Sequence, residues 1–190
     1  VCYWGLGSYA ILDLNEGLYA EIPREMLRTG SYLIPHLNYV PYIEKPPLLY
    51  WLTTLSYHVF GVNAFAARFV PATAMGLCAI GLLRFGQMLK RPFAGWCAAM
   101  MWLSSIGIFL IGRTILFDML LTWLFMLATF MFYLWYHSDR KLFLRIAYSA
   151  LALAVLDKGF LAIVLAAPII ALFFAWDRPG WKKFRAFWDV

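Results

Sequence analysis

The chain has 190 residues, of which 64% are hydrophobic, 19% aromatic and only 14% charged. Soluble globular chains carry about 25% charged residues, so this composition excludes a soluble domain. The basic residues behind the net charge of +6 stand mainly in short breaks between apolar runs, where the positive-inside rule places the Lys and Arg of cytoplasmic loops. We therefore expect membrane lipids, and no nucleic acid, among the partners.

The first apolar stretch, residues 1–12, is expected to be the end of a membrane helix, because it lacks the basic flank of a signal peptide. A mixed segment at residues 13–61, rich in Pro, Gly, Tyr and charge, is not expected to span. A helix needs about 20 apolar residues to cross a bilayer, so the later apolar runs predict further membrane helices. These runs are residues 63–89, 93–112, 116–136, 142–156 and 159–176.

The final segment, residues 177–190, alternates aromatic residues with Lys and Arg, as segments at a membrane interface do. We expect this basic segment on the cytoplasmic side. The sequence thus predicts an all-α polytopic membrane protein, with residues 1–176 forming a transmembrane helix bundle and residues 13–61 forming its first extracytoplasmic loop.

Two juxtamembrane helices are expected inside this loop. Residues 16–29 have Leu18, Ile22 and Met26 on one face, which predicts a short amphipathic helix ending at Gly30. Pro23 lies in its middle, so two shorter pieces are an equal alternative. A second apolar helix is expected to begin at the prolines of "EKPP" and to end at Gly61. It is too short to span, so we expect it along the membrane interface.

The charges of the breaks predict the orientation of the bundle. The breaks around residues 90–91 and 140–141 are basic and should face the cytoplasm. The first loop and the turns near Asp118 and Asp157 then lie on the extracytoplasmic side. Seven of the ten acids gather there, so a site is expected on that face: Asp13, Glu16, Glu21, Glu25, Glu44, Asp118 and Asp157.

Asp13 and Glu16 are the first candidates for chemistry. A partly desolvated carboxylate beside a membrane can act as the general base on an acceptor hydroxyl. The spacing of Asp13 and Glu16 is also that of a helix capping box, and Asn15 is itself a good N-cap residue. The spacing leaves capping and catalysis at even odds.

Glu44 and Lys45 precede two prolines that fix the local backbone. A Lys at a helix start is suited to a phosphate group, although the residues alone slightly favour an ordinary surface ion pair. His36 is a candidate to join Glu44 as a metal ligand, but two ligands without a characteristic spacing leave the metal open.

Arg113 and Asp118 flank the short turn "GRTILFD", and Asp157, Lys158 and Gly159 form another turn on the same face. Asp118 is suited to the N-cap of the following helix, and Asp157 with Lys158 to a snorkelling pair. Both turns become parts of a site only where the first loop comes close to them.

The blocks "NEGLYAEIPREM", "EKPP", "GRTILFDML" and "DKGFLA" together resemble the polyprenyl-phosphate glycosyltransferases of GT-C fold, which include the dolichyl-phosphate-mannose protein mannosyltransferases and the lipid A aminoarabinose transferases. The resemblance implies an enzyme of the bacterial inner membrane that moves a sugar from a polyprenyl-phosphate carrier to an extracytoplasmic acceptor, with inversion. The resemblance implies a divalent metal ion near Glu44 and no organic cofactor.

The resemblance also implies roles for single residues. The catalytic carboxylate falls on the stretch from Asp13 to Glu16, supported by Asp118. The contacts with the lipid phosphate fall on Lys45 and Lys158, and we add Arg113 and Tyr42 to them.

Two positions depart from the family pattern. Asn15 stands where the family usually has Asp, and Asp157 stands where it has Thr. The first departure leaves two interpretations open. Asp13 or Glu16 takes over as the base, or the protein is an inactive homologue that serves as a structural or lipid-binding subunit of a membrane complex. The chain is also shorter than family members, so we expect a fragment or a reduced homologue.

Overall fold

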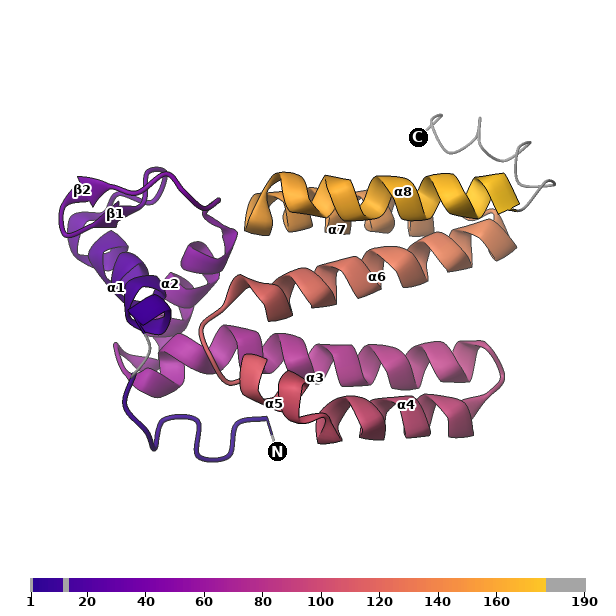
Figure 1. Ribbon diagram of the computed structural model, residues 1–190, viewed down its shortest axis with the longest axis horizontal. Helices are drawn as coiled ribbons and strands as arrows, with labels where there is room; N and C mark the ends of the chain where they lie inside the picture. The colour runs from indigo at the N-terminus through magenta and orange to yellow at the C-terminus, as the bar shows by residue number, and fades with distance from the viewer. Residues whose placement is uncertain (1, 12–13, 177–190) are drawn as a thin grey trace.

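The computed structural model describes residues 2–11 and 14–176 and is almost entirely helical (Figure 1). The all-α architecture expected from the sequence is confirmed. The elements in chain order are α1 (Leu14–Thr29), β1 (His36–Leu37), β2 (Val40–Pro41), α2 (Leu48–Phe60), α3 (Ala64–Met88), α4 (Pro92–Ser104), α5 (Ile106–Ile111), α6 (Phe117–Ser138), α7 (Lys141–Lys158) and α8 (Phe160–Trp176).

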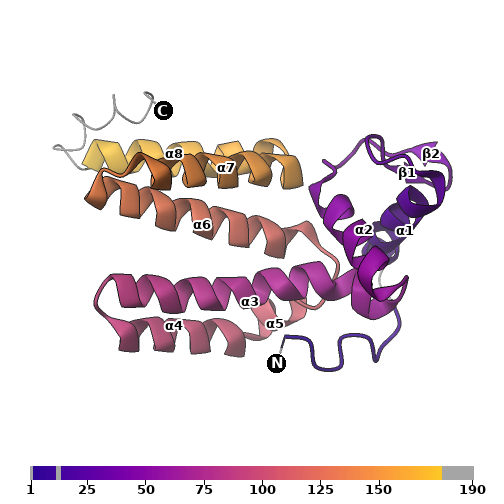
Figure 2. The same cartoon turned by 180° about the vertical axis from the view of Figure 1, so that it is seen from behind.

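The long helices form a bundle, and a smaller unit covers one of its ends. Helices α3, α4, α6, α7 and α8 run side by side along the long axis, as both views show (Figures 1 and 2). Helices α1 and α2 and the hairpin β1–β2 form the smaller unit, which we call the cap. The turns from α5 to α6 and from α7 to α8 lie at the same end of the bundle as the cap. The topology therefore brings the first loop and both candidate turns together.

Two helices of the bundle, α3 and α6, are long and apolar enough to cross a membrane. Helix α3 begins at Asn63, whose Oδ1 accepts a hydrogen bond from the backbone N–H of Ala66 at 2.9 Å. Its far end packs closely on α4, because a Cβ on Gly86 would lie only 2.5 Å from the Cα of Gly95. This glycine contact lets the two backbones approach each other as small residues do in membrane proteins.

Two expected spans differ from the structure. Residues 2–11 form turns and bends, not the end of a membrane helix, so that prediction is wrong. The carbonyls of Leu6, Tyr9 and Ala10 accept hydrogen bonds from the Arg68 side chain. These bonds compete with the backbone hydrogen bonds that a helix would need. The run at 93–112 is divided at Ser105, whose backbone is extended with ψ 120°, so it forms α4 and α5.

The first loop folds into the cap by burying apolar faces of both its helices. Helix α1 continues through Pro23 as one element, which decides between the two alternatives. Ile22 of α1 and Leu49 and Tyr50 of α2 are fully buried. The Tyr57 hydroxyl donates to the carbonyl of Ala20 at 3.0 Å and ties α2 to α1.

The hairpin in the cap has no clear signal in the sequence. Asn38 and Tyr39 form its two-residue turn with φ of 52° and 65°, as type I′ turns require. The buried carboxylate of Glu25 accepts hydrogen bonds from both of their backbone N–H groups, at 2.7 and 3.2 Å. Glu25 thus holds the hairpin against α1, and this explains one of the acids in the first loop.

Candidate functional site

Four of the candidate residues from the sequence line one cavity between the cap and the bundle: Tyr42, Glu44, Lys45 and Lys158. The cavity has a volume of about 410 Å³ and lies between the loop before α2 and the turn from α7 to α8. Pro46 and Gly159 complete its wall at the point where the two segments meet, since a Cβ on Gly159 would lie 3.7 Å from Pro46. We call this space the lysine cavity.

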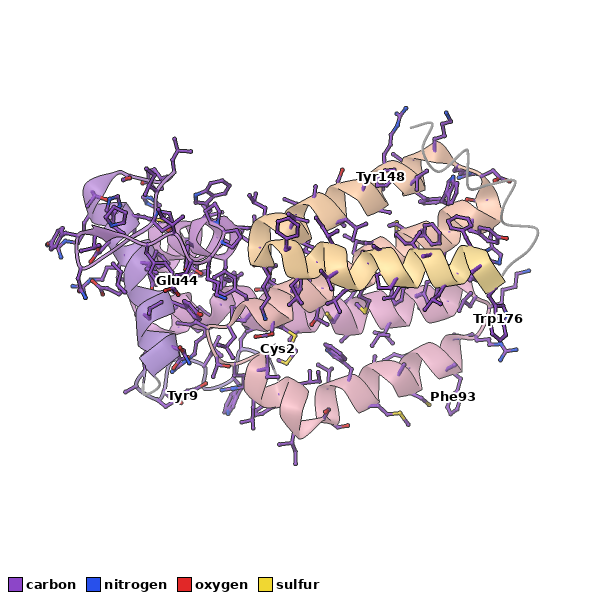
Figure 3. All side chains as sticks on the ribbon, turned by 45° about the horizontal axis from the view of Figure 1, so that its top comes forward. Cys2, Tyr9, Glu44, Phe93, Tyr148 and Trp176 are labelled. Carbon is purple, nitrogen blue, oxygen red and sulfur yellow. The ribbon has the colours of Figure 1, made fainter. Side chains whose placement is uncertain are left out.

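Tyr42 and Glu44 form a pair on the wall of the lysine cavity (Figure 3 labels Glu44). The Tyr42 hydroxyl donates a hydrogen bond to Glu44 Oε2 at 2.9 Å. Partial burial, together with this bond to the Glu44 carboxylate, raises the pKa of Tyr42 to about 12. The hydroxyl therefore stays protonated at physiological pH and holds the Glu44 side chain in place.

Lys158 joins the cavity to the start of α6. Its ammonium forms an ion pair with Asp118 Oδ1 at 2.5 Å, although the two residues are 40 positions apart. The Asp118 side chain is half exposed and that of Lys158 about one-fifth exposed. The structure therefore brings Asp118 next to the lysine that lines the cavity, as the topology of the spans predicted for the two turns.

Asp157 lies in the last turn of α7, past the apolar run of residues 142–156. Its side chain is fully buried, and neither carboxylate oxygen has a hydrogen-bond partner among the residues that the structure describes. This burial raises the pKa of Asp157 to about 8, and the charge of Lys158 opposes the shift only in part. The group is therefore mostly uncharged at pH 7, so it adds little negative charge beside Lys158.

Glu16 points into the protein and is bound by an arginine that the sequence analysis missed. Its two oxygens accept hydrogen bonds from Nε and Nη2 of Arg68 at 2.7 and 2.8 Å. Arg68 is fully buried and Glu16 only 3% exposed. An arginine inside an otherwise apolar span was the available signal, since ionisable residues in membrane segments are expensive and are retained with a partner.

Arg68 also holds the N-terminal segment. Its Nη1 donates to the carbonyls of Leu6 and Tyr9 at 3.0 and 2.9 Å, and its Nη2 donates to that of Ala10 at 3.0 Å. With the two bonds to Glu16, all five N–H donors of the guanidinium are used. The guanidinium also lies 3.8 Å from the centre of the Tyr9 ring.

The start of α1 carries the remaining catalytic candidates. Asn15 is exposed in the first turn of α1, directly before the buried Glu16. Asp13 lies outside the residues that the structure describes. Its role therefore stays a prediction, and so do the roles of Glu16 and Asp118.

Arg113 lies apart from the lysine cavity. It lines a second cavity of about 850 Å³ between the N-terminal segment and α5. Its guanidinium lies 4.9 Å from the centre of the Phe109 ring, and its carbonyl accepts a hydrogen bond from the Tyr9 hydroxyl at 2.9 Å. The structure thus does not bring Arg113 together with Lys45 and Lys158.

The residues expected to hold a metal ion are Glu44 and His36. Within residues 2–11 and 14–176, no three His, Cys, Asp or Glu side chains are close enough together to hold a metal ion. Glu44 accepts a hydrogen bond from Tyr42. His36 Nδ1 is buried and has no hydrogen-bond partner among the described residues. The two residues alone do not make a ligand set, so a metal ion near Glu44 stays a prediction.

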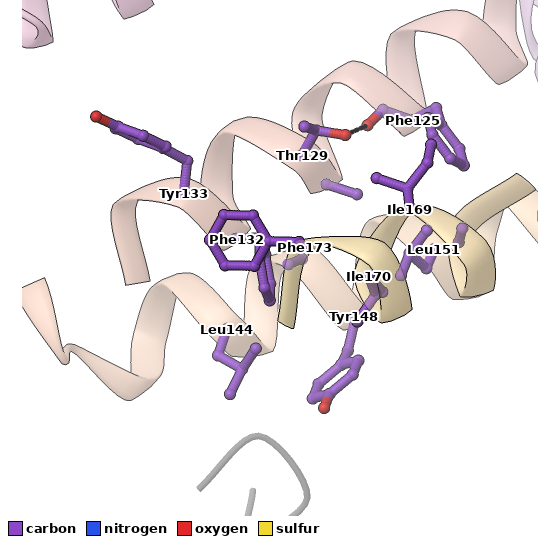
Figure 4. A pocket seen from close by; sticks show the side chains of 13 residues that line it. Phe125, Thr129, Phe132, Tyr133, Leu144, Tyr148, Leu151, Ile169, Ile170 and Phe173 are labelled. Atoms are coloured by element: carbon purple, nitrogen blue, oxygen red, sulfur yellow. Dashed lines mark hydrogen bonds between the residues drawn. The ribbon is translucent and has the colours of Figure 1, made fainter. Parts of the chain in front are cut away.

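Two further cavities are apolar. One of about 150 Å³ lies between α6, α7 and α8, where Phe132, Leu144 and Phe173 face it (Figure 4). Its Thr129 hydroxyl is bonded to the carbonyl of Phe125 at 2.9 Å, so it is not available to a ligand as a donor. The other is a groove of about 680 Å³ between α2, α3 and α6, and Leu48 is among its lining residues. Leu48 directly follows Pro47, which lines the lysine cavity.

Comparison with protein families gives a match to the dolichyl-phosphate-mannose-protein mannosyltransferase family over residues 44–189, more than half of the chain. The chain belongs to this family. Among curated relatives it is 35% identical over 164 residues to the undecaprenyl phosphate-alpha-4-amino-4-deoxy-L-arabinose arabinosyl transferase of Aeromonas salmonicida. It is 33% identical over 178 residues to the transferase of the same name from Shewanella sediminis.

The matches cover 83% and 91% of this chain but only 29% and 32% of those two relatives. The chain thus spans about a third of the length of the curated relatives it matches. Among solved structures, ArnT from Cupriavidus metallidurans in the apo state and bound to undecaprenyl phosphate both align with a TM-score of 0.91. They cover 97% of this chain and 36% and 35% of theirs, at 22% and 23% identity, so this likeness confirms the polytopic GT-C-like fold.

Proposed function

We propose that the chain is part of an integral-membrane glycosyltransferase that takes its sugar from a polyprenyl-phosphate carrier. The observation that carries the proposal is the lysine cavity, in which Lys45 and Lys158 approach from segments more than 100 residues apart. Two cations in a partly enclosed space suit a phosphate group. Family membership and the names of the relatives support the same donor class.

The apolar groove supports a lipid carrier rather than a soluble sugar phosphate. It is lined almost entirely by apolar side chains, most of them from α2, α3 and α6, and its lining residue Leu48 directly follows Pro47 of the lysine cavity wall in the chain. A polyprenyl chain in this groove would bury apolar surface at about 25 cal/mol per Å² while its phosphate stays at the lysines. The groove thus supplies affinity and the cavity supplies the position of the reacting group.

In the proposed reaction, an acceptor hydroxyl attacks the anomeric carbon of the sugar on the face opposite the phosphate. The new bond joins the acceptor oxygen to this carbon, the bond from the carbon to the phosphate oxygen breaks, and the configuration inverts. The polyprenyl phosphate leaves with the electron pair, and Lys45 and Lys158 stabilise its charge. The acceptor proton passes to a carboxylate.

The carboxylate that takes this proton is sought near the start of α1. Glu16 is committed to Arg68 in a buried bidentate pair, so we assign it a positioning role. Asn15 has no basic group. Asp13, two residues upstream of Asn15, is our candidate for the base, and Asp118 is our candidate for holding Lys158 until the phosphate arrives.

Binding of undecaprenyl phosphate to the intact protein in detergent tests the donor site. A charge-assisted hydrogen bond contributes about 1.5–3 kcal/mol, so we expect Lys45→Gln and Lys158→Gln each to raise the Kd by about 10-fold or more. Lys90→Asn is the matched control, because Lys90 belongs to the turn from α3 to α4, which lies at the end of the bundle away from the cap, and Asn tolerates its φ of 58°. Unchanged affinity in both Gln variants would exclude the lysine cavity as the phosphate site.

The inactive homologue is the second candidate function, and the exposed Asn15 at the family's acidic position favours it. Both candidates predict binding of undecaprenyl phosphate, so only turnover separates them. Release of undecaprenyl phosphate from a sugar-loaded donor by the wild-type protein, abolished in Asp13→Asn, supports the enzyme. Donor binding with no turnover by the intact wild-type protein supports the inactive homologue.

A further inference from the structure

Asp157 has no part in the proposed reaction, although it directly precedes Lys158 of the lysine cavity. Its side chain is fully buried at the end of α7, and neither of its oxygens has a hydrogen-bond partner within residues 2–11 and 14–176. An ionised carboxylate is costly to bury without a partner, so such a group keeps its proton instead. The carboxyl group therefore holds a proton inside the protein, one residue away from a lysine that lines the cavity.

The two charges nearest to this carboxyl group act on it in opposite directions. Burial raises the pKa of Asp157 to about 8, the ammonium of Lys158 lowers it, and the carboxylate of Asp118 at the start of α6 raises it. Asp118 is also the ion-pair partner of Lys158. An anion that pairs with Lys158 thus makes the proton on Asp157 harder to remove.

A phosphate group bound at Lys158 is a further anion in the same place. A phosphate monoester carries about −1.5 to −2 charge at pH 7, which exceeds the single charge of Asp118. It therefore acts on Asp157 in the same direction as Asp118 does, and more strongly at the same distance. An ionised Asp157, in turn, repels the phosphate and competes with it for the charge of Lys158.

Other titratable groups around the end of α7 do not take over this role at pH 7 to 9. Helix α7 packs against α2, α6 and α8, and α8 carries no titratable residue. Burial raises the pKa of Tyr57 on α2 to about 12, and it raises those of Tyr50 on α2 and Tyr19 on α1 above their ordinary value. His58 is exposed in the last turn of α2. The other charged or titratable side chains that line the cavity with Lys158 are Tyr42, Glu44 and Lys45.

We propose that binding of the donor phosphate in the lysine cavity is coupled to protonation of Asp157, so that the cavity binds a phosphate with this carboxyl group neutral. A protein whose Asp157 is ionised takes up one proton from the solvent as the phosphate binds, and the new O–H bond forms on the buried carboxylate. This coupling rests on the proposed donor site. It is reciprocal, because the proton and the phosphate each raise the affinity for the other by the same factor.

The affinity for the phosphate should fall as the pH rises through 8. In the free protein, about one-tenth of Asp157 is ionised at pH 7 and about nine-tenths at pH 9. If the bound phosphate tightens proton binding tenfold or more, the Kd at pH 9 is about 5- to 10-fold larger than at pH 7. The second ionisation of a phosphate monoester lies near pH 6, below this range, so the probe itself changes little.

Calorimetric titration of the intact protein in detergent with undecaprenyl phosphate tests the coupling. Titrations at pH 8 in Hepes and in Tris, whose ionisation enthalpies differ, give the number of protons taken up for each phosphate bound. We expect about half a proton for the wild type at this pH, and none for Asp157→Asn. The ratio of the Kd at pH 9 to that at pH 7 should fall to about 1 in Asp157→Asn, because Asn is neutral at both pH values.

Glu21→Gln is the matched control. Glu21 is a partly exposed carboxylate of α1 that pairs with Arg24, so its removal should keep both the proton uptake and the Kd ratio of the wild type. No proton uptake by the wild type, or an equal Kd ratio in wild type and Asp157→Asn, would overturn the proposal. The proton count needs only the wild type, so the test does not depend on the folding of a variant.

Failure of the donor site gives a different result. In that case Lys45→Gln binds undecaprenyl phosphate as tightly as the wild type at both pH values. If only the coupling fails, Lys45→Gln still weakens binding, while wild type and Asp157→Asn respond to pH in the same way.

Discussion

The pair of Glu16 and Arg68 gives the sharpest prediction about stability. Arg68→Met removes the guanidinium and leaves the Glu16 carboxylate, only 3% exposed, without its partner. It also removes the donors of three backbone carbonyls. Removing one partner of a buried ion pair costs about 3–5 kcal/mol. We therefore expect Arg68→Met to lower the free energy of unfolding by about this amount.

A double-mutant cycle separates the pair from general packing. Glu16→Gln keeps the shape of the side chain and removes its charge, so we expect a smaller loss of about 1–3 kcal/mol. In the double variant neither charge is left buried alone, so its loss should be clearly less than the sum of the two single losses. Arg84→Met, an exposed arginine on the same helix, is the matched control.

The assay is denaturant or thermal unfolding of the intact protein in detergent, with proteolysis of the N-terminal segment as a second readout. Arg68→Met should expose residues 2–11 to protease, because their carbonyls lose their donors. A loss below about 1 kcal/mol for Arg68→Met, or additive losses in the double variant, would refute the reasoning that the pair is a buried and coupled unit.

Three other predictions concern the cap and the site. The pKa of Asp157 is about 8 against an ordinary 3.8, so the folded state keeps a proton that the unfolded chain loses, and stability falls between about pH 4 and 8. Asp157→Asn should therefore stabilise the protein more at pH 8 than at pH 5, by at most about 1.4 kcal/mol per pH unit; equal unfolding midpoints relative to wild type at both pH values would contradict this. Glu25→Ala should destabilise the hairpin by about 1–3 kcal/mol, measured by faster hydrogen exchange at Asn38 and Tyr39, and unchanged exchange there would count against it. Asn15→Asp should raise the rate of donor turnover if the family's acidic position is the base, whereas an unchanged rate supports Asp13.

Much of the fold was available from the sequence because the bilayer imposes a simple length rule on apolar runs. The run at 116–136 became α6 almost unchanged, and the basic breaks placed Asp118 and Lys158 at one end, where they pair. The break between α4 and α5 at Ser105 could not be predicted in the same way, because one extended residue divides an apolar run without changing its composition.

The contacts that the sequence did not reveal join residues far apart in the chain. Glu16 and Arg68 are 52 positions apart, and their pairing leaves no periodic pattern. The same pairing explains why residues 2–11 are not helical, since an apolar composition predicts a helix only where no side chain takes the backbone carbonyls. Asn38 and Tyr39 also gave no strong turn signal in the sequence. Their positive φ values are stabilised by hydrogen bonds that their backbone N–H groups donate to Glu25, which belongs to another element.

The burial of Arg68 has a consequence for the order in which the protein assembles. An arginine in a membrane segment costs about 2.5–3.5 kcal/mol at mid-bilayer and less towards a helix end, and Arg68 stands in the second turn of α3. Until α1 supplies the Glu16 carboxylate, this charge has to remain in contact with water or lipid headgroups. Docking of α1 and of the N-terminal segment therefore completes the seating of α3. A variant that delays this docking would leave α3 inserted but loosely held, and so exposed to membrane quality control before the cap is seated on the bundle.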